Sequence, residues 1–368
     1  MLDRIDRRTL LIFGGYLVAF VIVAGANILG LPPIVRFVLA VVALAGGAVA
    51  VGEATERLSQ RMTPAATGVV QSVLGNLPEL FLAIFALQAG LNQVVIAALV
   101  GSVLGNALFV LGLATLIGGL RHGTLKFSAA ANRLYATELL LGIAALTVPF
   151  LATQPGAPDF GHAEELSAFV AIVLLVLFVV SVPMSLKLST AAPAAKPHVP
   201  SDDDETTPEP QHSLRSTLAL LAASAVSAAF VADWFVEALE PAMATIGMSE
   251  AFAGLIVVAL ASNAVENLAG VTSAAKGKGD LSMSLILNSA LQIVLFLTPV
   301  IVLLSFFVAP VPLTLIISPL LLGTLAVSVL LVIFIVTDGE ANAFEGAMLL
   351  GLYLIIAAAV WFGPVIGT

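Results

Sequence analysis

A glutamate lies near the middle of a long apolar stretch of this chain, and its placement restricts the folds open to the chain. Glu79 stands within the run from Ala65 to Ala89, close to Gly75, Asn76 and Pro78. An ionised group at the centre of a bilayer is costly, so a residue of this kind marks a functional site. Gly75 and Pro78 weaken an α-helix at the same point, because glycine loosens the backbone and proline removes a donor. The sequence therefore predicts a membrane helix that is broken at this point, with backbone carbonyls left free of helical hydrogen bonds. These carbonyls, the Asn76 carboxamide and the Glu79 carboxylate together form a predicted site for a hard cation.

The same arrangement occurs a second time in the chain. Asn263 and Glu266 lie within the apolar run from Ala251 to Ala275, 187 positions after Asn76 and Glu79. Several further pairs keep this offset: Ser102 and Ser289, Gly90 and Gly277, Leu104 and Leu291, Phe109 and Phe296. An internal repeat of this length predicts a duplicated transporter fold with its site at the interface of the two halves.

The composition is that of an integral membrane protein. Hydrophobic residues make up 60% of the 368 positions and charged residues only 10%, against about 25% charged residues in a soluble domain. Cysteine is absent, which excludes disulfides, thiolate catalysis and cysteine-ligated metals. The N-terminal apolar stretch is long and no cleavage site clearly follows it, so we expect no cleavable signal peptide.

Eleven hydrophobic spans are each long enough, at about 20 residues, to cross a bilayer. They cover approximately Leu10–Leu29, Ile34–Val51, Ala65–Ala89, Asn92–Gly118, Arg133–Leu151, Leu166–Leu186, Ser216–Leu239, Ala251–Ala275, Leu281–Phe307, Leu313–Thr337 and Phe344–Phe362. The first span has no counterpart in the repeat. The predicted fold class is an all-α polytopic membrane protein, with one extra N-terminal helix and two five-helix repeats.

Basic residues predict the orientation of these spans. With the N-terminus in the cytoplasm, every Lys and Arg except Arg36 falls on the cytoplasmic side, as the positive-inside rule requires. Five spans per repeat is an odd number, so the two halves insert in opposite senses and form an inverted repeat. The expected location is a bacterial cytoplasmic membrane.

The predicted organisation has four parts. Residues 1–32 form the N-terminal transmembrane helix, 33–188 the first repeat, 189–213 a cytoplasmic linker and 214–368 the second repeat. The linker is rich in proline and carries Asp202, Asp203, Asp204 and Glu205. Such a segment is typically solvated and disordered; attraction or sensing of cations is the alternative.

Several motifs resemble those of the calcium/proton antiporters, a branch of the calcium/cation antiporter superfamily. The matching stretches are Gly52–Glu56, Gly75–Leu80, Ile84–Leu87, Gly101–Asn106, Leu239–Pro241, Met248–Phe252, Ser262–Glu266 and Ser289–Ile293. The resemblance covers about residues 50 to 365 and implies an eleven-span fold that exchanges a cytoplasmic cation for protons. Three positions depart from the family pattern: Asn267 replaces a histidine, and Ser262 and Asn288 replace glycines.

The candidate cation ligands come from both halves. Calcium takes about 6–8 oxygen ligands, and Glu79 and Glu266 supply the carboxylates. Asn76 and Asn263 precede these glutamates by three residues, so that on a helix each pair shares a face. Ser102, Ser289 and Gln292, on the following spans, add oxygens directly or through water. Each of these polar residues also has a structural alternative, namely helix packing or a bond to its own helix backbone.

Paired carboxylates also suggest how a cation flux is coupled to protons. Two carboxylates in a low-dielectric site repel each other and resist ionisation, whereas a divalent cation stabilises the ionised pair. Protons and the cation therefore compete for Glu79 and Glu266. Glu53, Glu56 and Glu240 lie near span ends, where they either serve cation access or gating or are solvated surface acids.

Other functions remain open at this point. The same fold suits an exchanger of Na⁺, K⁺ or Mn²⁺, and less well a cation channel, because a pore usually needs a ring of side chains from several subunits. A membrane enzyme is disfavoured, because the chain has no His-x-x-Glu-His or Gly-x-Ser-x-Gly motif. The expected partners are inorganic cations, protons and the lipid bilayer, with no nucleic acid and no resident cofactor. The sequence leaves the oligomeric state open.

Overall fold

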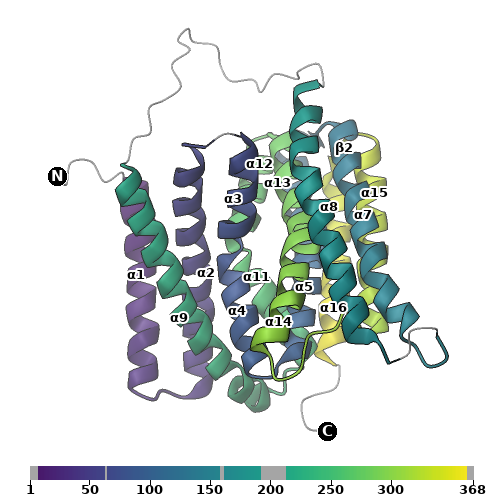
Figure 1. The fold of residues 1–368 in the computed structure, drawn as a ribbon. Coiled ribbons are helices and arrows are strands. Elements are labelled where there is room, and N and C mark those ends of the chain that lie inside the picture. The colour runs from purple at the N-terminus through teal and green to yellow at the C-terminus, as the bar shows by residue number, and fades with distance from the viewer. Residues whose placement is uncertain (1–6, 63, 158–160, 192–212, 363–368) are drawn as a thin grey trace.

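Long apolar helices make up most of the chain in the computed structural model (Figure 1). The structure describes residues 7–62, 64–157, 161–191 and 213–362. Within these residues nine helices are long and apolar enough to cross a membrane. The pair Glu250–Ser262 and Ala264–Ala275 passes the same test as one span bent by 65°. The predictions of a mostly helical, membrane-integral protein are confirmed.

The first part of the chain contains eight α-helices, one π-helix and one short strand. In order they are α1 (Arg7–Ile28), α2 (Pro33–Ser59), α3 (Pro64–Gly75), α4 (Leu77–Gln88), α5 (Asn92–Leu104), η1 (Gly105–Val110), α6 (Leu111–His122), β1 (Thr124–Lys126), α7 (Ala129–Ala152) and α8 (Ala163–Ala191). Helices α5, η1 and α6 form one continuous span of 31 residues.

The second part repeats this pattern with more interruptions. Its elements are α9 (Leu214–Ile246), α10 (Glu250–Phe252), η2 (Ala253–Val258), α11 (Ala259–Ser262), α12 (Ala264–Ala275), α13 (Gly279–Gln292), η3 (Ile293–Leu297), α14 (Thr298–Val308), α15 (Pro319–Thr337), β2 (Glu340–Asn342) and α16 (Ala343–Trp361). Helices α4 and α12 both contain 12 residues and start 187 positions apart, so the sequence repeat is also a repeat of structure at this point.

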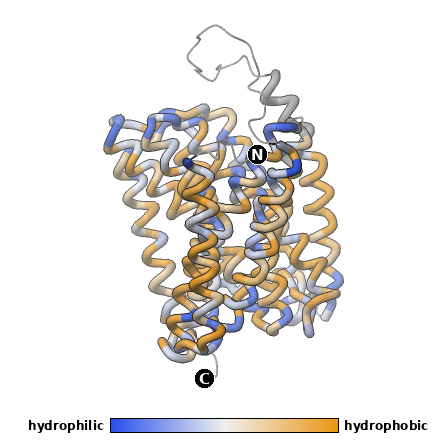
Figure 2. The backbone as a smooth tube through the Cα atoms, turned by 90° about the vertical axis from the view of Figure 1, so that its left-hand side faces the viewer, coloured by the Kyte–Doolittle hydropathy of each residue, from blue (hydrophilic) through white to orange (hydrophobic). Residues whose placement is uncertain are grey.

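The two ends of the bundle differ in charge. The end at the top of Figure 1, which we call the basic end, carries Arg57 at the end of α2, Arg121 at the end of α6, and Lys276 and Lys278 between α12 and α13. Strands β1 and β2 pair antiparallel at this end and join the loops of the two parts. Figure 2 shows hydrophobic residues along the length of the helices and hydrophilic residues gathered towards both ends.

Helices α2 and α9 extend beyond the predicted spans, to Ser59 and Ile246, and one predicted span begins before its helix does. The span predicted from Leu313 begins as a helix only at Pro319, and residues 313–318 have no regular secondary structure. Pro319 occupies the first turn of α15, where its missing N–H costs nothing, and Ser318 caps the helix by accepting from the backbone N–H of Leu321 at 3.4 Å. Residues 192–212 of the predicted linker lie outside the described residues, so that prediction stays untested.

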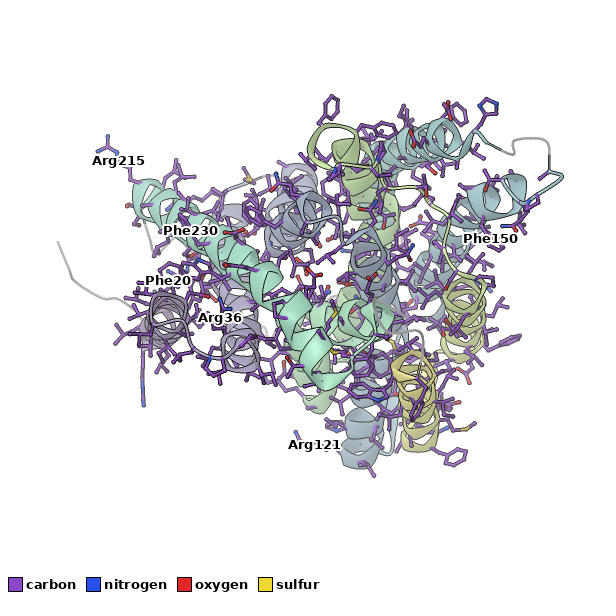
Figure 3. The ribbon with its side chains drawn as sticks, turned by 90° about the horizontal axis from the view of Figure 1, so that it is seen from below. Phe20, Arg36, Arg121, Phe150, Arg215 and Phe230 are labelled. Carbon is purple, nitrogen blue, oxygen red and sulfur yellow. The ribbon has the colours of Figure 1, made fainter. Side chains whose placement is uncertain are left out.

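Helices α1, α2 and α9 pack as a group at one side of the bundle (Figure 1). Gly46 and Gly47 of α2 leave room for the ring of Tyr16 on α1. The rings of Phe20 and Trp234 lie 5.4 Å apart, centroid to centroid, and join α1 to α9; Figure 3 shows Phe20 and Phe230 on these neighbouring helices. The N-terminal helix is therefore attached chiefly to α2 and α9.

Helix α5 packs very closely against η2. A side chain at Gly101 would collide with the backbone of Leu255, and one at Gly254 would collide with the backbone carbonyl of Val94. Two elements from different halves therefore approach at backbone distance, which only glycine allows at these positions.

Replacing Gly101 with alanine is expected to destabilise the protein, because the new methyl group has no space against Leu255. Overpacking of this kind costs about 1–3 kcal/mol. Gly105, four residues further along the chain, is the matched control, since a side chain there meets no described atom within 4 Å. Thermal unfolding in detergent should show a lower midpoint for Gly101→Ala than for Gly105→Ala; equal midpoints would contradict the packing described.

Candidate functional site

The first predicted break in a membrane helix is present between α3 and α4. The chain leaves the helical conformation at Asn76, with φ −89° and ψ 12°. Helix α4 then starts at Leu77, with Pro78 and Glu79 in its first turn. Proline fits there because the first N–H groups of a helix have no intrahelical partner. The break therefore puts Glu79 in the first turn of a new helix, directly after the interruption.

The second break has the same backbone geometry without a proline. Asn263 adopts φ −90° and ψ 20°, and α12 starts at Ala264 with Glu266 in its first turn. The Asn263 carboxamide donates to the carbonyl of Ala259 at 3.0 Å, just as the Asn76 carboxamide donates to Ser72 at 2.7 Å. Each asparagine side chain thus donates a hydrogen bond to a backbone carbonyl of the preceding turn, which stabilises the helix break.

Two further helices bring oxygen-bearing side chains to the breaks. Ser102 lies near the end of α5, and Ser289 and Gln292 lie near the end of α13. Each of these helices passes directly into a π-helix, η1 or η3. Such bulges are rare and occur often at functional sites, because they shift the face that the following residues present.

Three hydrogen bonds cross between the two halves at this level. Asn263 Nδ2 donates to Ser102 Oγ at 2.9 Å, and Asn76 Nδ2 donates to Gln292 Oε1 at 3.5 Å. Asn106 Nδ2 donates to Ser289 Oγ at 3.2 Å. The structure therefore brings the five predicted neutral residues together, and both halves contribute to the cluster.

The two glutamates meet in this cluster. Glu79 is only 8% exposed, whereas Glu266 is half-buried, and the two carboxylates are close enough to repel each other. Glu79 Oε2 has no hydrogen-bond partner among the described residues. Glu79, Ser102 and Ser262 line one small cavity, whose other walls are apolar. A buried carboxylate with a free oxygen beside a second carboxylate is a strong candidate for binding a proton or a cation.

The three glutamates predicted for access or gating lie on α2 and α9. Glu53 is half-buried and pairs with Arg57, with 3.0 Å between Oε1 and Nη2. Glu56, on the next turn of α2, is exposed. Glu240 is exposed on α9 and lies near Glu250. Glu53 is nevertheless near the site along α2, since the preceding residue, Gly52, lies against Val265 of α12.

Asn106 is absent from the ligand set predicted from sequence, although it belongs to the cluster. Its side chain is 1% exposed, and its Oδ1 has no hydrogen-bond partner among the described residues. A buried carboxamide oxygen without a partner is costly, so it is available to a bound cation or water. The sequence does contain a hint of this role: Asn106 lies four residues, about one helical turn, after the predicted ligand Ser102, so the two residues share a helix face.

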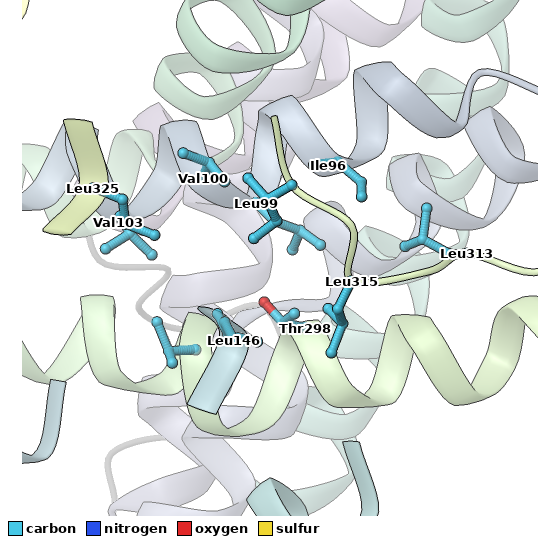
Figure 4. Close-up of a pocket in the computed structure, with 11 residues that line it drawn as sticks. Ile96, Leu99, Val100, Val103, Leu146, Thr298, Leu313, Leu315 and Leu325 are labelled. Atoms are coloured by element: carbon cyan, nitrogen blue, oxygen red, sulfur yellow. The ribbon is translucent and has the colours of Figure 1, made fainter. Parts of the chain in front are cut away.

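A second cavity differs from the cation-site cluster because its lining is almost entirely apolar (Figure 4). It lies between α5, α7, α14, α15 and the irregular segment before α15, with Leu99, Leu146 and Leu315 among its walls. Thr298 is the one hydroxyl that lines it in the described part of the chain. Apolar cavities of this kind stay dry, and one hydroxyl alone does not make a cation site.

Known proteins are similar to this chain in both sequence and fold. A Ca(2+)/H(+) antiporter of Synechocystis sp. is 35% identical over 340 residues, covering 89% of this chain and 91% of that protein. The Ca(2+)/H(+) antiporter ChaA of Bacillus subtilis is 33% identical over 327 residues, covering 89% and 92%. The structure of native YfkE superposes with a TM-score of 0.80 at 28% identity, covering 96% of this chain and all of that one.

The family comparison covers both halves of the repeat. The profile described as sodium/calcium exchanger protein matches residues 32–187 and 216–362. The resemblance to calcium/proton antiporters found in the motifs is thereby confirmed. The chain belongs to the sodium/calcium exchanger protein family.

Proposed function

We propose that this protein is a secondary antiporter that exchanges Ca²⁺ for protons across a membrane. One observation carries the proposal: two glutamates, one from each half, approach each other at matched helix breaks in the middle of the bundle. The names of its relatives, Ca(2+)/H(+) antiporters that match along nine-tenths of their length, point to the same reaction.

The ligand set suits calcium. Glu79 and Glu266 offer two to four carboxylate oxygens, and Asn76, Asn263, Asn106, Ser102, Ser289 and Gln292 surround them. Calcium accepts 6–8 oxygens in flexible geometry, whereas magnesium demands an octahedron and dehydrates reluctantly. The ends of α3 and α11 direct their carbonyls, the negative ends of the helix dipoles, towards the breaks.

Competition between protons and calcium would couple the two fluxes. Without a cation, the two carboxylates repel each other, and taking up protons removes the repulsion. Calcium stabilises the ionised pair and displaces those protons. If the empty, doubly charged site cannot cross between the two access states, neither ion moves without the other.

The fold supports an arrangement of eleven spans. Nine helices and the bent span of α10 to α12 account for ten, and α3 with α4 across the Asn76 break makes the eleventh. With α1 set apart, the others form two inverted five-helix repeats related by the 187-residue offset. The positive-inside rule favours a cytoplasmic basic end; a cytoplasmic N-terminus and a bacterial inner membrane are part of this proposal.

Ion flux in proteoliposomes tests the proposal. An imposed pH gradient should drive calcium uptake, and a calcium gradient should drive proton movement in the opposite direction. A channel would pass calcium without obligatory proton countermovement, and a membrane enzyme would show no flux. Uptake of calcium that ignores the pH gradient would overturn the proposal.

A further inference from the structure

The small cavity beside Glu79 extends from the predicted ligands towards one end of the bundle. Helices α4 and α14 end, and α5 and α10 begin, at the end opposite the basic end, which we call the non-basic end (Figure 1). The apolar walls of the cavity come from the parts of these helices, and of η2 and η3, that lie between the site and this end. They are two alanines and Leu82, Val95, Leu99, Val258, Leu297 and Ile301. The cavity therefore extends away from the basic end.

The stretches of chain between the site and the non-basic end are apolar throughout their length. Every residue in 80–87, 94–101 and 251–261 is a glycine or carries a hydrocarbon side chain. In 293–304, Thr298 is the one residue with a polar side chain, and it lines the other, apolar cavity. A cation that entered from the non-basic end would therefore meet no charged or carboxamide group before the site.

The helices that reach the site from the basic end have a different composition. Residues 64–75 of α3 include a threonine, a glutamine and a serine. Residues 280–288 of α13 include an aspartate, two serines and an asparagine. A purely apolar approach is therefore specific to the non-basic side of the site and is not a general property of these membrane helices.

The elements on the non-basic side are also packed against one another. The backbones of α5 and η2 meet through Gly101 and Gly254. Helix α4 contacts α5 and α14, and α5 contacts η3. Leu82 of α4 is 2% exposed and Leu297 of η3 is 1% exposed. Apolar side chains in close contact therefore separate the Glu79 carboxylate from the non-basic end.

Leu99 has a special position among these side chains. It lines the cavity beside Glu79 and also the apolar cavity of Figure 4, so it forms part of the wall between the two. A leucine with an apolar cavity on its far side can move away from the site without entering water. Leu99 is therefore the wall residue best placed to open and close the site on this side.

We propose that Leu99 is the central side chain of a hydrophobic gate that closes the site towards the non-basic end, a proposal that rests on the proposed function only in taking the cluster around Glu79 as the cation site. Narrow apolar constrictions lose their water and so exclude ions. Such a gate keeps water and cations at the non-basic end away from Glu79 without any ion pair.

The test uses cysteine reporters, and the absence of native cysteines gives them a clean background. Ser102→Cys, which we call the site reporter, places a thiol of similar size at the polar wall of the cavity. A charged, membrane-impermeant methanethiosulfonate reagent is added to right-side-out and to inside-out membrane vesicles. Gln93→Cys and Ser216→Cys, both at exposed positions, show which preparation presents the non-basic end and which the basic end.

From the non-basic end, Leu99→Ala is expected to speed labelling of the site reporter by about tenfold or more, because it widens the constriction and joins the two cavities. Leu99→Asn, which keeps the volume and makes the constriction polar, should speed it as well. Leu146→Ala is the matched control, since Leu146 lines only the apolar cavity, and it should label within about twofold of the parent.

Labelling from the non-basic end that stays slow in both Leu99 variants would overturn the gate. So would an equal increase in Leu146→Ala, or an equal increase from both ends, because either result would indicate a general loosening of the bundle. Should Leu99→Ala fail to fold, Leu99→Asn carries the same comparison. Labelling requires no transport, so this result is independent of the ion flux that tests antiport.

Discussion

Replacing Glu79 with glutamine is expected to abolish proton-driven calcium uptake. Glutamine keeps the size of the side chain and one oxygen, but it can neither release a proton nor supply a second carboxylate to the cation. Truncating one partner of a buried charge pair costs about 2–5 kcal/mol, which corresponds to about a thirtyfold or greater loss. Uptake by proteoliposomes under a pH gradient is the measurement.

A matched substitution separates this loss from a general effect on folding. Glu138 lies half-buried on α7, outside the cluster, and Glu138→Gln makes the same chemical change. We expect this control to transport at nearly the rate of the unmodified protein. Proton-coupled uptake that survives in Glu79→Gln would remove Glu79 from the coupling mechanism.

Calcium binding is expected to weaken steeply as the pH falls. Protons occupy the carboxylate oxygens that calcium needs, so acid disfavours the calcium-bound form. The dissociation constant should rise by about tenfold per pH unit for each proton that calcium displaces. Isothermal titration of purified protein at two pH values measures this slope.

The glutamine variants make this second prediction specific. If Glu79 and Glu266 together hold the displaced protons, Glu266→Gln should bind calcium more weakly and with a shallower dependence on pH. A dependence as steep as that of the unmodified protein would assign the displaced protons to groups other than Glu266.

The breaks were predictable because their chemistry is local. Gly75 and Pro78 mark the first break directly, whereas the second has no proline and was found only through the offset from Asn76 and Glu79. The predicted Leu313 boundary was wrong, because apolar composition does not distinguish an extended segment from a helix. Helix α15 starts at Pro319 instead.

Other features depend on contacts that no local pattern records. Asn106 contributes to the cluster from within a π-helix, and the shift of a π-helix is set by its packing. The β1–β2 ribbon pairs segments more than 200 positions apart. The close approach at Gly101 depends on the position of the Leu255 backbone, which the sequence does not give.

Proton release on calcium binding is the most direct test of the competition between the two ions for Glu79 and Glu266. Calcium is added to purified protein in weakly buffered solution, and the change in pH is recorded. We predict release of about one to two protons per bound calcium, and none from the Glu79→Gln, Glu266→Gln double variant. Calcium that binds to the unmodified protein without releasing protons would contradict the account.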